Sequence, residues 1–199
     1  LNEFNLGEMK SIENAEKYNF IRVFGKKELQ EEEDKPDLKK FIREAKEQID
    51  AYKGSVDAII GFFDFPVTLL TFLLCDIYKL RGPTLYSGLK CEHKYWSRLE
   101  QQKVIPKHIP KFTTINPFDP PDFERLEIST PFWLKPVKAF ASQLGYRIDS
   151  REEYEASLEE IRKEIHLFAD PYNYLLSQVN LPEEISGIDG NHCIAEELI

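Results

Sequence analysis

The segment 56–80 constrains the fold of this chain most strongly, because a continuous apolar run is followed at once by a helix signal. Residues 56–63, VDAIIGFF, are rich in β-branched and aromatic side chains, which is typical of a strand covered on both faces, as in a parallel sheet. Asp64 and Pro66 then give an N-cap and first-turn signal for a helix that we expect to run to about Leu80. The segment therefore predicts a buried strand followed by a helix.

The residues before this segment predict the same order of elements, a strand followed by a helix. NFIRVFG, at 19–25, is typical of a short strand, and apolar residues at helical spacing from Asp37 to Lys53 predict an amphipathic helix. Strand, helix, strand, helix is the βαβ order of an open parallel sheet. We therefore expect residues 1–108 to form a Rossmann-like parallel αβ domain.

The character of the chain changes after residue 83. Ser87 is expected to cap a helical stretch, and the prolines at 106 and 110 predict an extended connector that places a domain boundary near 105–110. Residues 109–199 then predict an α+β domain whose strands pair antiparallel, with a capping box at Ser150 and Glu153 starting a helix to about Phe168. The expected strands are 111–115, 131–137, one near 145–149, and 192–199.

Composition excludes several classes of function. A net charge of −9 argues against binding to a nucleic-acid backbone, which needs a basic surface. The longest apolar run, VTLLTFLLCDIYKL, is interrupted by charges and falls short of the roughly 20 residues of a membrane span. The three cysteines share no CxxC spacing, so they suggest neither a disulfide framework nor a zinc site. We expect a cytoplasmic protein without membrane or nucleic-acid partners.

Lys135 stands at the end of the strand-like run PFWLKPV. A lysine there usually lies along apolar surface with its ammonium group in water, and that interpretation remains open. The loop KAFASQLG, at 138–145, adds a second feature, because backbone N–H groups between two strands can approach a phosphate closely. A lysine followed by such a loop is typical of a triphosphate-binding site.

Three segments, in order, resemble the ATP-grasp superfamily. CEHKYWSRLEQQKVIPKHIPKF is similar to the family's helix and proline-containing connector, with His93 where aspartate is usual. PFWLKPVKAFASQLGYRIDSREE is similar to its strand, phosphate loop, return strand and capped helix. CIAEELI is similar to the strand whose backbone holds adenine. The resemblance covers nearly the whole chain and implies a leading Rossmann-like domain followed by the first ATP-binding lobe.

The resemblance also implies roles for individual residues. Lys135 and Lys94 contact the nucleotide phosphates, and Ser142 belongs to the loop that covers them. The backbone carbonyl of Glu196 accepts from the adenine amino group, and the backbone N–H of Ile199 donates to the ring. Each residue also has an ordinary structural interpretation, such as a surface lysine, a turn serine or a core isoleucine. No residue is assigned to catalysis, and none of the histidines has a partner pattern.

The chain departs from the family pattern at two features that bind the phosphates, the loop that covers them and the ligands of Mg²⁺. The loop is poor in glycine, since Phe140, Gln143 and Leu144 stand where the family often has glycine and only Gly145 remains. Side chains there predict either a loop held away from the phosphates or a more ordered lid. The family's magnesium ligands follow the adenine strand, so the resemblance implies an incomplete ATP-grasp lobe with Mg²⁺ ligands beyond residue 199 and no metal ligand in this chain.

The implied function is that of the N-terminal part of an ATP-dependent carboxylate–amine ligase, which activates a small carboxylate as an acyl phosphate. The fragment alone is expected to be inactive, and a homodimer is compatible with the resemblance. Phe63 and Asp64, at a strand end, are candidates for the substrate site, although Asp64 is most simply the N-cap of the next helix. The alternative is a nucleotide-binding module of ATP-grasp ancestry without catalysis. A dinucleotide-binding protein is disfavoured, because no GxGxxG follows a predicted strand.

Overall fold

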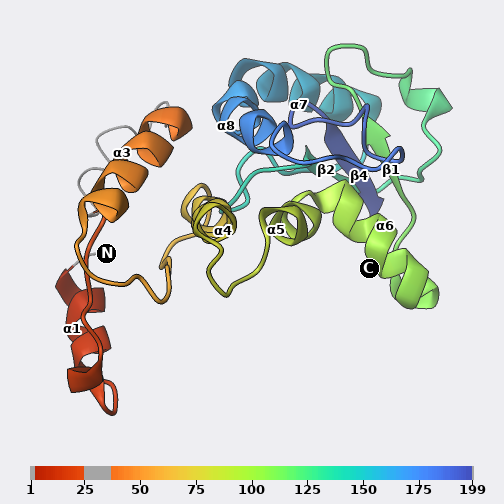
Figure 1. The fold of residues 1–199 in the computed structure, drawn as a ribbon. Helices are drawn as coiled ribbons and strands as arrows, with labels where there is room; N and C mark the ends of the chain where they lie inside the picture. The colour runs from red at the N-terminus through yellow and green to blue at the C-terminus, as the bar shows by residue number, and fades with distance from the viewer. Residues whose placement is uncertain (1–2, 25–36, 199) are drawn as a thin grey trace. The chain divides into compact units, whose positions relative to one another are not determined.

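The chain forms two compact units, Leu1–Thr84 and Leu85–Ile199. This computed structural model describes residues 3–24 and 37–198 (Figure 1), so Gly25 and Ile199 lie outside the described part. The division falls earlier than the domain boundary expected after residue 108, because the helices between 85 and 104 contact elements of the second unit. The expected boundary stays a prediction about the functional domains.

The first unit is helical in its described part. It contains α1 (Glu3–Ser11), a 3-10 turn η1 (Ala15–Lys17), α3 (Leu38–Ala51) and α4 (Val67–Tyr78). The predicted helix at 37–53 is confirmed as α3, and the Asp37 side chain caps it by accepting from the backbone N–H of Lys40 at 3.0 Å. The predicted helix after Asp64 is confirmed as α4, but its N-cap is Pro66 rather than Asp64, because the Asp64 carboxylate accepts from the N–H of Phe65 ahead of the helix. In the part of the chain that the structure describes, no helix is both long and apolar enough to cross a bilayer.

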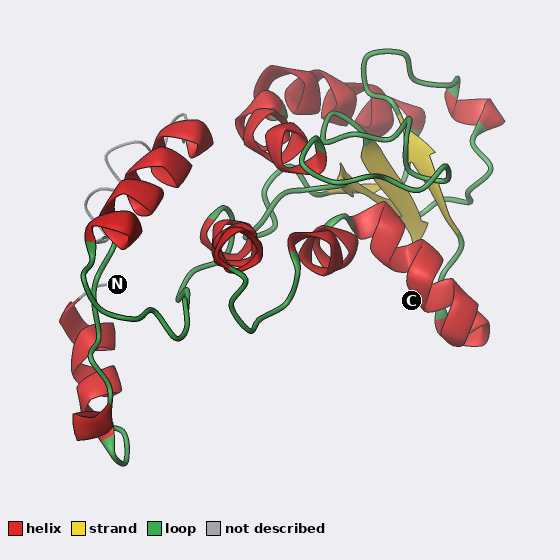
Figure 2. Ribbon diagram, viewed as in Figure 1, coloured by secondary structure: helices red, strands yellow, loops and turns green. Residues whose placement is uncertain are grey.

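The expected parallel Rossmann-like sheet is not present in the described residues of this unit. Figure 2 shows loop rather than strand at 19–24 and 56–63, and neither stretch has a strand partner. Ile60, Phe62 and Phe63 are exposed, whereas a strand in a parallel sheet is covered on both faces. An apolar, β-branched run favours extended backbone, but a strand also requires hydrogen bonds to a neighbour. The prediction was wrong on this second requirement.

The second unit begins with α5 (Leu85–Glu92) and α6 (Lys94–Val104). Sequence predicted one helical stretch capped at Ser87, but the helix starts at Leu85 and is interrupted at His93, whose backbone is extended. The helix predicted from Ser150 is divided too, into α7 (Arg151–Glu164) and α8 (His166–Leu176). The remaining elements are η2 (Pro106–His108), η3 (Phe123–Arg125), β1 (Phe112–Ile115), β2 (Phe132–Pro136), β3 (Tyr146–Ile148) and β4 (Cys193–Glu197).

The four strands form one antiparallel sheet in the order β1-β4-β2-β3. All four were predicted, and their antiparallel pairing is confirmed. The last strand is inserted in the centre, so that Glu196 lies opposite Phe112 of β1 on one side and Trp133 of β2 on the other. The sheet thereby brings Lys135 and Glu196 to neighbouring strands although 61 residues separate them in the sequence.

The two faces of the sheet have different chemistry. One face is apolar and packs on α7 and α8 through a core that includes Phe132, Leu134, Leu158 and Ala195. Alternation along the strands puts Trp133, Lys135 and Glu196 on the opposite face. There α6 covers part of the sheet, since Tyr95 stacks edge-on against Phe112 with ring centroids 5.5 Å apart. Figure 1 shows α6 and the α7–α8 pair on opposite sides of the strands.

Candidate phosphate-binding site

The start of α6 is fixed by backbone contacts to two neighbouring segments. The backbone N–H of Lys94 donates to the carbonyl of Val137, just after β2, at 2.9 Å, and the N–H of Val137 donates to His192 at 2.9 Å. These bonds place the first residue of α6 beside the end of β2 and the beginning of β4. Two of the predicted site residues, Lys94 and Lys135, therefore meet at one end of the sheet.

His93 is the N-cap of α6 and is fully buried. Its Nδ1 accepts from the backbone N–H of Trp96 at 3.2 Å, so the opposite nitrogen, Nε2, carries the proton and donates to the carbonyl of Ile188 at 3.0 Å. Burial lowers the pKa of His93 from 6.5 to about 4, which keeps the ring neutral and preserves this pair of contacts. His93 therefore caps the helix with a ring nitrogen, a role that Ser, Thr, Asp or Asn side chains commonly have.

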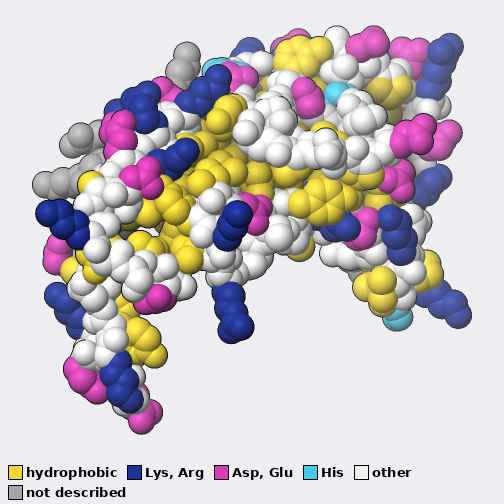
Figure 3. Space-filling model, viewed as in Figure 1, with side chains coloured by type: hydrophobic (Ala, Val, Ile, Leu, Met, Phe, Trp, Pro, Cys, Tyr) yellow, Lys and Arg dark blue, Asp and Glu magenta, His cyan; other side chains and the backbone are white. Residues whose placement is uncertain are grey.

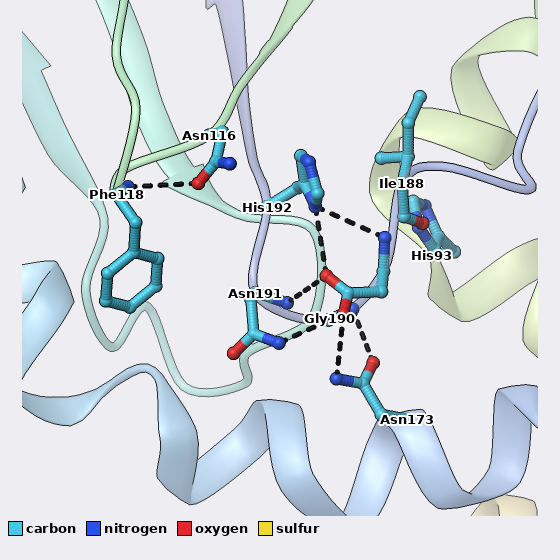
Figure 4. Close-up of polar contacts among 9 residues, drawn as sticks. His93, Asn116, Phe118, Asn173, Ile188, Gly190, Asn191 and His192 are labelled. Carbon is cyan, nitrogen blue, oxygen red and sulfur yellow. Dashed lines mark hydrogen bonds and ion pairs between the residues drawn. The ribbon is translucent and has the colours of Figure 1, made fainter.

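The segment that His93 contacts is held by a network around Asp189 (Figure 4). Its carboxylate accepts from Asn173 at 3.2 Å and from the side chain and backbone of Asn191, each at 3.0 Å. The contact with His192, at 3.0 Å, is the main cause that lowers the pKa of Asp189 to about 2. A groove of about 510 Å³ adjoins this network, but none of the predicted site residues lines it. We interpret the network as support for the start of α6.

Four cationic side chains, Lys94, Lys135, Lys138 and Arg98, form what we call the cation cluster. Lys135 and Arg98 both pair with Glu196, the latter from Nε to Oε2 at 2.9 Å, and the almost fully buried Lys138 pairs with Glu92. Lys94 donates from Nζ to the carbonyl of Ala139 at 3.0 Å. Among the described residues, these contacts set two carboxylates against four cations.

Burial and the neighbouring charges determine the electrostatics of the cluster. Burial, then the nearby charges of Lys138 and Lys135, lower the pKa of Lys94 from 10.5 to about 8. For Glu196, burial acts to raise the pKa, but hydrogen bonds and charge from Lys135 and Arg98 leave it below its usual value. A polyanion that approached the cluster would offset the repulsion among the lysines. In contrast, dark blue and magenta side chains are mixed over the outer surface drawn in Figure 3.

The loop after Lys135 has an ordered conformation despite its lack of glycine. Ala141, Ser142 and Leu144 adopt positive φ of 52°, 59° and 54°. Phe140 packs edge-on against Phe168 with ring centroids 5.6 Å apart, and the Leu144 side chain is buried in the core. These contacts hold the loop against the core of the second unit.

Strain in this loop gives a stability prediction. We expect Ala141→Gly to raise the free energy of unfolding by about 0.5–1 kcal/mol, since a left-handed conformation costs an L-residue roughly 1–2 kcal/mol and glycine's extra chain entropy offsets part of that gain. Ala139→Gly, in the same loop but without positive φ, is the matched control and should be destabilising. Urea unfolding monitored by circular dichroism measures both. A destabilised Ala141→Gly protein would contradict the prediction.

The other predicted site residues have separate outcomes. Ser142 is exposed on the loop, and its carbonyl accepts from the N–H of Gly145 at 3.3 Å. Phe63 is exposed and the Asp64 carboxylate accepts from the N–H of Phe65 at 2.7 Å, both in the first unit. Ile199 is outside the described residues. Glu196 lies opposite Phe112 and Trp133 in the sheet, and its carbonyl oxygen has two lone pairs, so a ligand can share it with a strand neighbour.

Sequence reasoning missed Arg98, Lys138 and Glu92. For Glu196 and Glu197 its ordinary structural interpretation was that one side chain faces solvent and the other pairs with a lysine, and Glu196 does pair with Lys135. Arg98 stands four residues after Lys94 on one helix, a spacing that puts two side chains on the same face. This spacing was the available signal for Arg98. The pairing of Glu92 with Lys138 joins residues 46 apart and depends on the tertiary fold.

Comparison with known proteins supports the architecture. No protein-family model and no curated protein sequence matches the chain. The structure is similar to the crystal structure of L-amino acid ligase from Bacillus licheniformis, with a TM-score of 0.56 and 19% identity, over 82% of this chain and 34% of the ligase. D-alanine–D-alanine ligase from Helicobacter pylori also matches, with a TM-score of 0.41 and 16% identity, over 63% of this chain and 33% of that ligase. The second likeness is too distant to support an argument.

About four fifths of the chain, 82%, is therefore similar in fold to part of an L-amino acid ligase. This confirms the resemblance of the three sequence segments at the level of the fold. The chain spans about a third of the length of the solved ligases that it matches.

Proposed function

We propose that residues 109–199, with α5 and α6, form the first ATP-binding lobe of an ATP-dependent carboxylate–amine ligase. The observation that carries the proposal is the cation cluster at the end of β2, which unites Lys94 and Lys135 on one face of the sheet. ATP carries the multiple negative charges that such a cluster neutralises. Phosphoryl transfer depends mainly on positioning and neutralising phosphate oxygens, which is what these side chains are suited to do.

Each chemical group of ATP has a proposed contact. Lys94 and Lys135 bind phosphate oxygens, and the loop at 139–144, including Ser142, covers them. The adenine amino group donates to the backbone carbonyl of Glu196, while the N–H of Ile199 completes the contact with the ring. Phe63 and Asp64 are proposed to face a small carboxylate substrate, which ATP activates as an acyl phosphate for attack by an amine.

Magnesium does not fit the described residues. No group of three or more His, Cys, Asp or Glu side chains within 3–24 and 37–198 is arranged to hold a metal ion. We therefore derive no step that passes through Mg²⁺ on this part of the chain. The family's use of Mg²⁺ remains a proposal for ligands beyond residue 199.

Nucleotide binding tests the proposal directly. Saturation-transfer NMR with the 199-residue chain should show transfer to the adenine and ribose protons of ADP at millimolar concentration, and inorganic tripolyphosphate should compete. A weak interaction suffices for this measurement, as expected if one lobe supplies only part of the site. No transfer from folded protein at any accessible ADP concentration would contradict the proposal.

The non-catalytic nucleotide-binding module remains the second candidate. The observation in its favour is the anchored loop, since a cover fixed by Phe140 and Leu144 moves less readily than a glycine-rich one. Assays of ATP hydrolysis with a panel of carboxylates and amines, on the intact protein, separate the two functions. Carboxylate-dependent release of ADP supports the ligase, whereas nucleotide binding without turnover supports the module.

The lowered pKa of Lys94 predicts a pH dependence of binding. We expect the affinity for ADP to be constant below about pH 8 and to fall above it by up to about tenfold per pH unit, because the neutral amine must take up a proton before it binds phosphate. Calorimetric titrations between pH 7 and 9.5, in buffers of different ionisation enthalpy, should detect proton uptake near pH 8. In Lys94→Gln this uptake should vanish. Equal uptake in the variant would assign it to another group.

A further inference from the structure

The Glu196 carboxylate bridges two cations, Lys135 and Arg98. One oxygen pairs with Lys135, and the other accepts from Arg98 Nε at 2.9 Å. Only 5% of the residue is exposed, whereas the Lys135 side chain is 27% exposed and accessible to a ligand. The cation proposed for phosphate binding is therefore already neutralised by a buried neighbour.

A ligand that binds Lys135 has to compete with this carboxylate. Leaving a buried carboxylate without a partner is costly, so Glu196 could give up Lys135 only if another cation kept it paired. Arg98 meets this requirement because its hydrogen bond uses the other oxygen. The side chain of Arg98 is itself oriented by Gln101, which accepts from its Nη1 at 2.8 Å.

We propose that Glu196 is an internal counter-ion that occupies Lys135 until a polyphosphate replaces it, and that Arg98 is the positioning residue that retains Glu196 afterwards. The inference rests on the proposed function only in taking the ligand of the cluster to be a phosphate chain. No bond is made or broken apart from ion pairs and hydrogen bonds.

The arrangement selects for ligands with several charges. A single small anion gains one contact with Lys135 and loses the existing Glu196 pair, so its net gain is small. A polyphosphate reaches Lys94 as well, whose ammonium donates to the carbonyl of Ala139 and has no carboxylate bonded to it among the described residues. The cluster should therefore bind tripolyphosphate strongly and orthophosphate poorly.

Substitution of Glu196 tests the inference, because removing this side chain should increase the affinity for polyphosphate rather than decrease it. We expect Glu196→Gln to bind inorganic tripolyphosphate about tenfold more tightly, which corresponds to 1.4 kcal/mol, because the competitor for Lys135 is lost. A purely structural role predicts weaker binding instead. Glu197→Gln, at the next position of β4, makes the same change of charge and should leave the affinity nearly unchanged. Isothermal titration calorimetry measures all three proteins, and orthophosphate provides the comparison ligand.

Two further variants complete the experiment. Glu196→Asp keeps a carboxylate for Arg98 but is too short to bridge both cations, so it should also bind more tightly and provides a second test if Glu196→Gln fails to fold. Arg98→Met should weaken binding in the wild-type background, and most of this effect should disappear when Glu196→Gln is present. Unchanged or weaker binding by folded Glu196→Gln and Glu196→Asp proteins would overturn the inference. Absence of ADP binding by the wild type would instead contradict the proposed function.

Discussion

Replacing His93 with alanine is expected to lower the free energy of unfolding by about 3 kcal/mol. Loss of an N-cap costs about 1 kcal/mol, and leaving the buried carbonyl of Ile188 without its donor costs a further 1–3 kcal/mol. The start of α6 would lose its cap and its connection to the Asp189 network together. Urea unfolding of the two proteins, followed by circular dichroism, measures the difference.

The pH dependence of stability provides the control for His93. Because the folded-state pKa of about 4 lies below the unfolded value of about 6.5, stability is fully present above pH 6.5 and is lost progressively as the pH falls to 4. Protonation of His93 over this pH range lowers the free energy of unfolding by about 3 kcal/mol. His93→Asn should cap the helix and remove this component, while Asp189, with its pKa of about 2, still contributes a loss at lower pH. Identical pH profiles for wild type and His93→Asn would contradict the assignment.

Replacing Lys135 with methionine is expected to reduce the affinity for ADP by about 10- to 100-fold. A hydrogen bond to a charged group is worth about 1.5–3 kcal/mol, and each 1.4 kcal/mol is a factor of ten. The fold should persist, since Glu196 keeps Arg98 as a partner and methionine matches the aliphatic stem of lysine. NMR titration with ADP measures the affinity. In the intact protein, the same change should abolish turnover of ATP.

Lys103→Met is the matched control for this experiment. Lys103 lies on α6, is exposed, and pairs with Glu100 at 2.8 Å rather than with the cation cluster. The substitution removes the same charge from the chain, so it reports any effect of net charge alone. Similar losses of ADP affinity in both variants would remove Lys135 from the phosphate site.

The parts of the fold that sequence predicted correctly are those set by local pattern. The helix at 37–53 has an apolar stripe and an aspartate cap, and the strand 131–137 alternates between the core and the opposite face. The parallel sheet in residues 1–108 was predicted wrongly because the apolar run 56–63 specifies extended backbone but no neighbouring strand. The break at His93 was also missed, since helical periodicity continues through it.

The candidate site divides in the same way. Lys94 and Lys135 were predicted from two motifs, each carried by contiguous residues, and the fold brings them together. The ion pairs of these lysines could not be predicted from contiguous motifs. Glu196 is 61 positions from Lys135 and lies beside it only because β4 pairs with β2, and Arg98 is 98 positions from Glu196. The proposals for Ser142, Phe63 and Asp64 depend on ligands and remain predictions.

The central position of β4 also governs the order of events during folding. Among the described residues, strands β1 and β2 do not pair with each other and are joined through residues 193–197 of β4, which are synthesised after the other three strands of this sheet. Pairing across such long separations is slow, because the entropy of closing a long loop is lost before the contacts form. On the ribosome, helices α5 to α8 can form early, but the sheet must wait for β4 to emerge. Until then the edge of β2 that pairs with β4 has no strand beside it, and this interval is where we expect the nascent chain to depend most on chaperones.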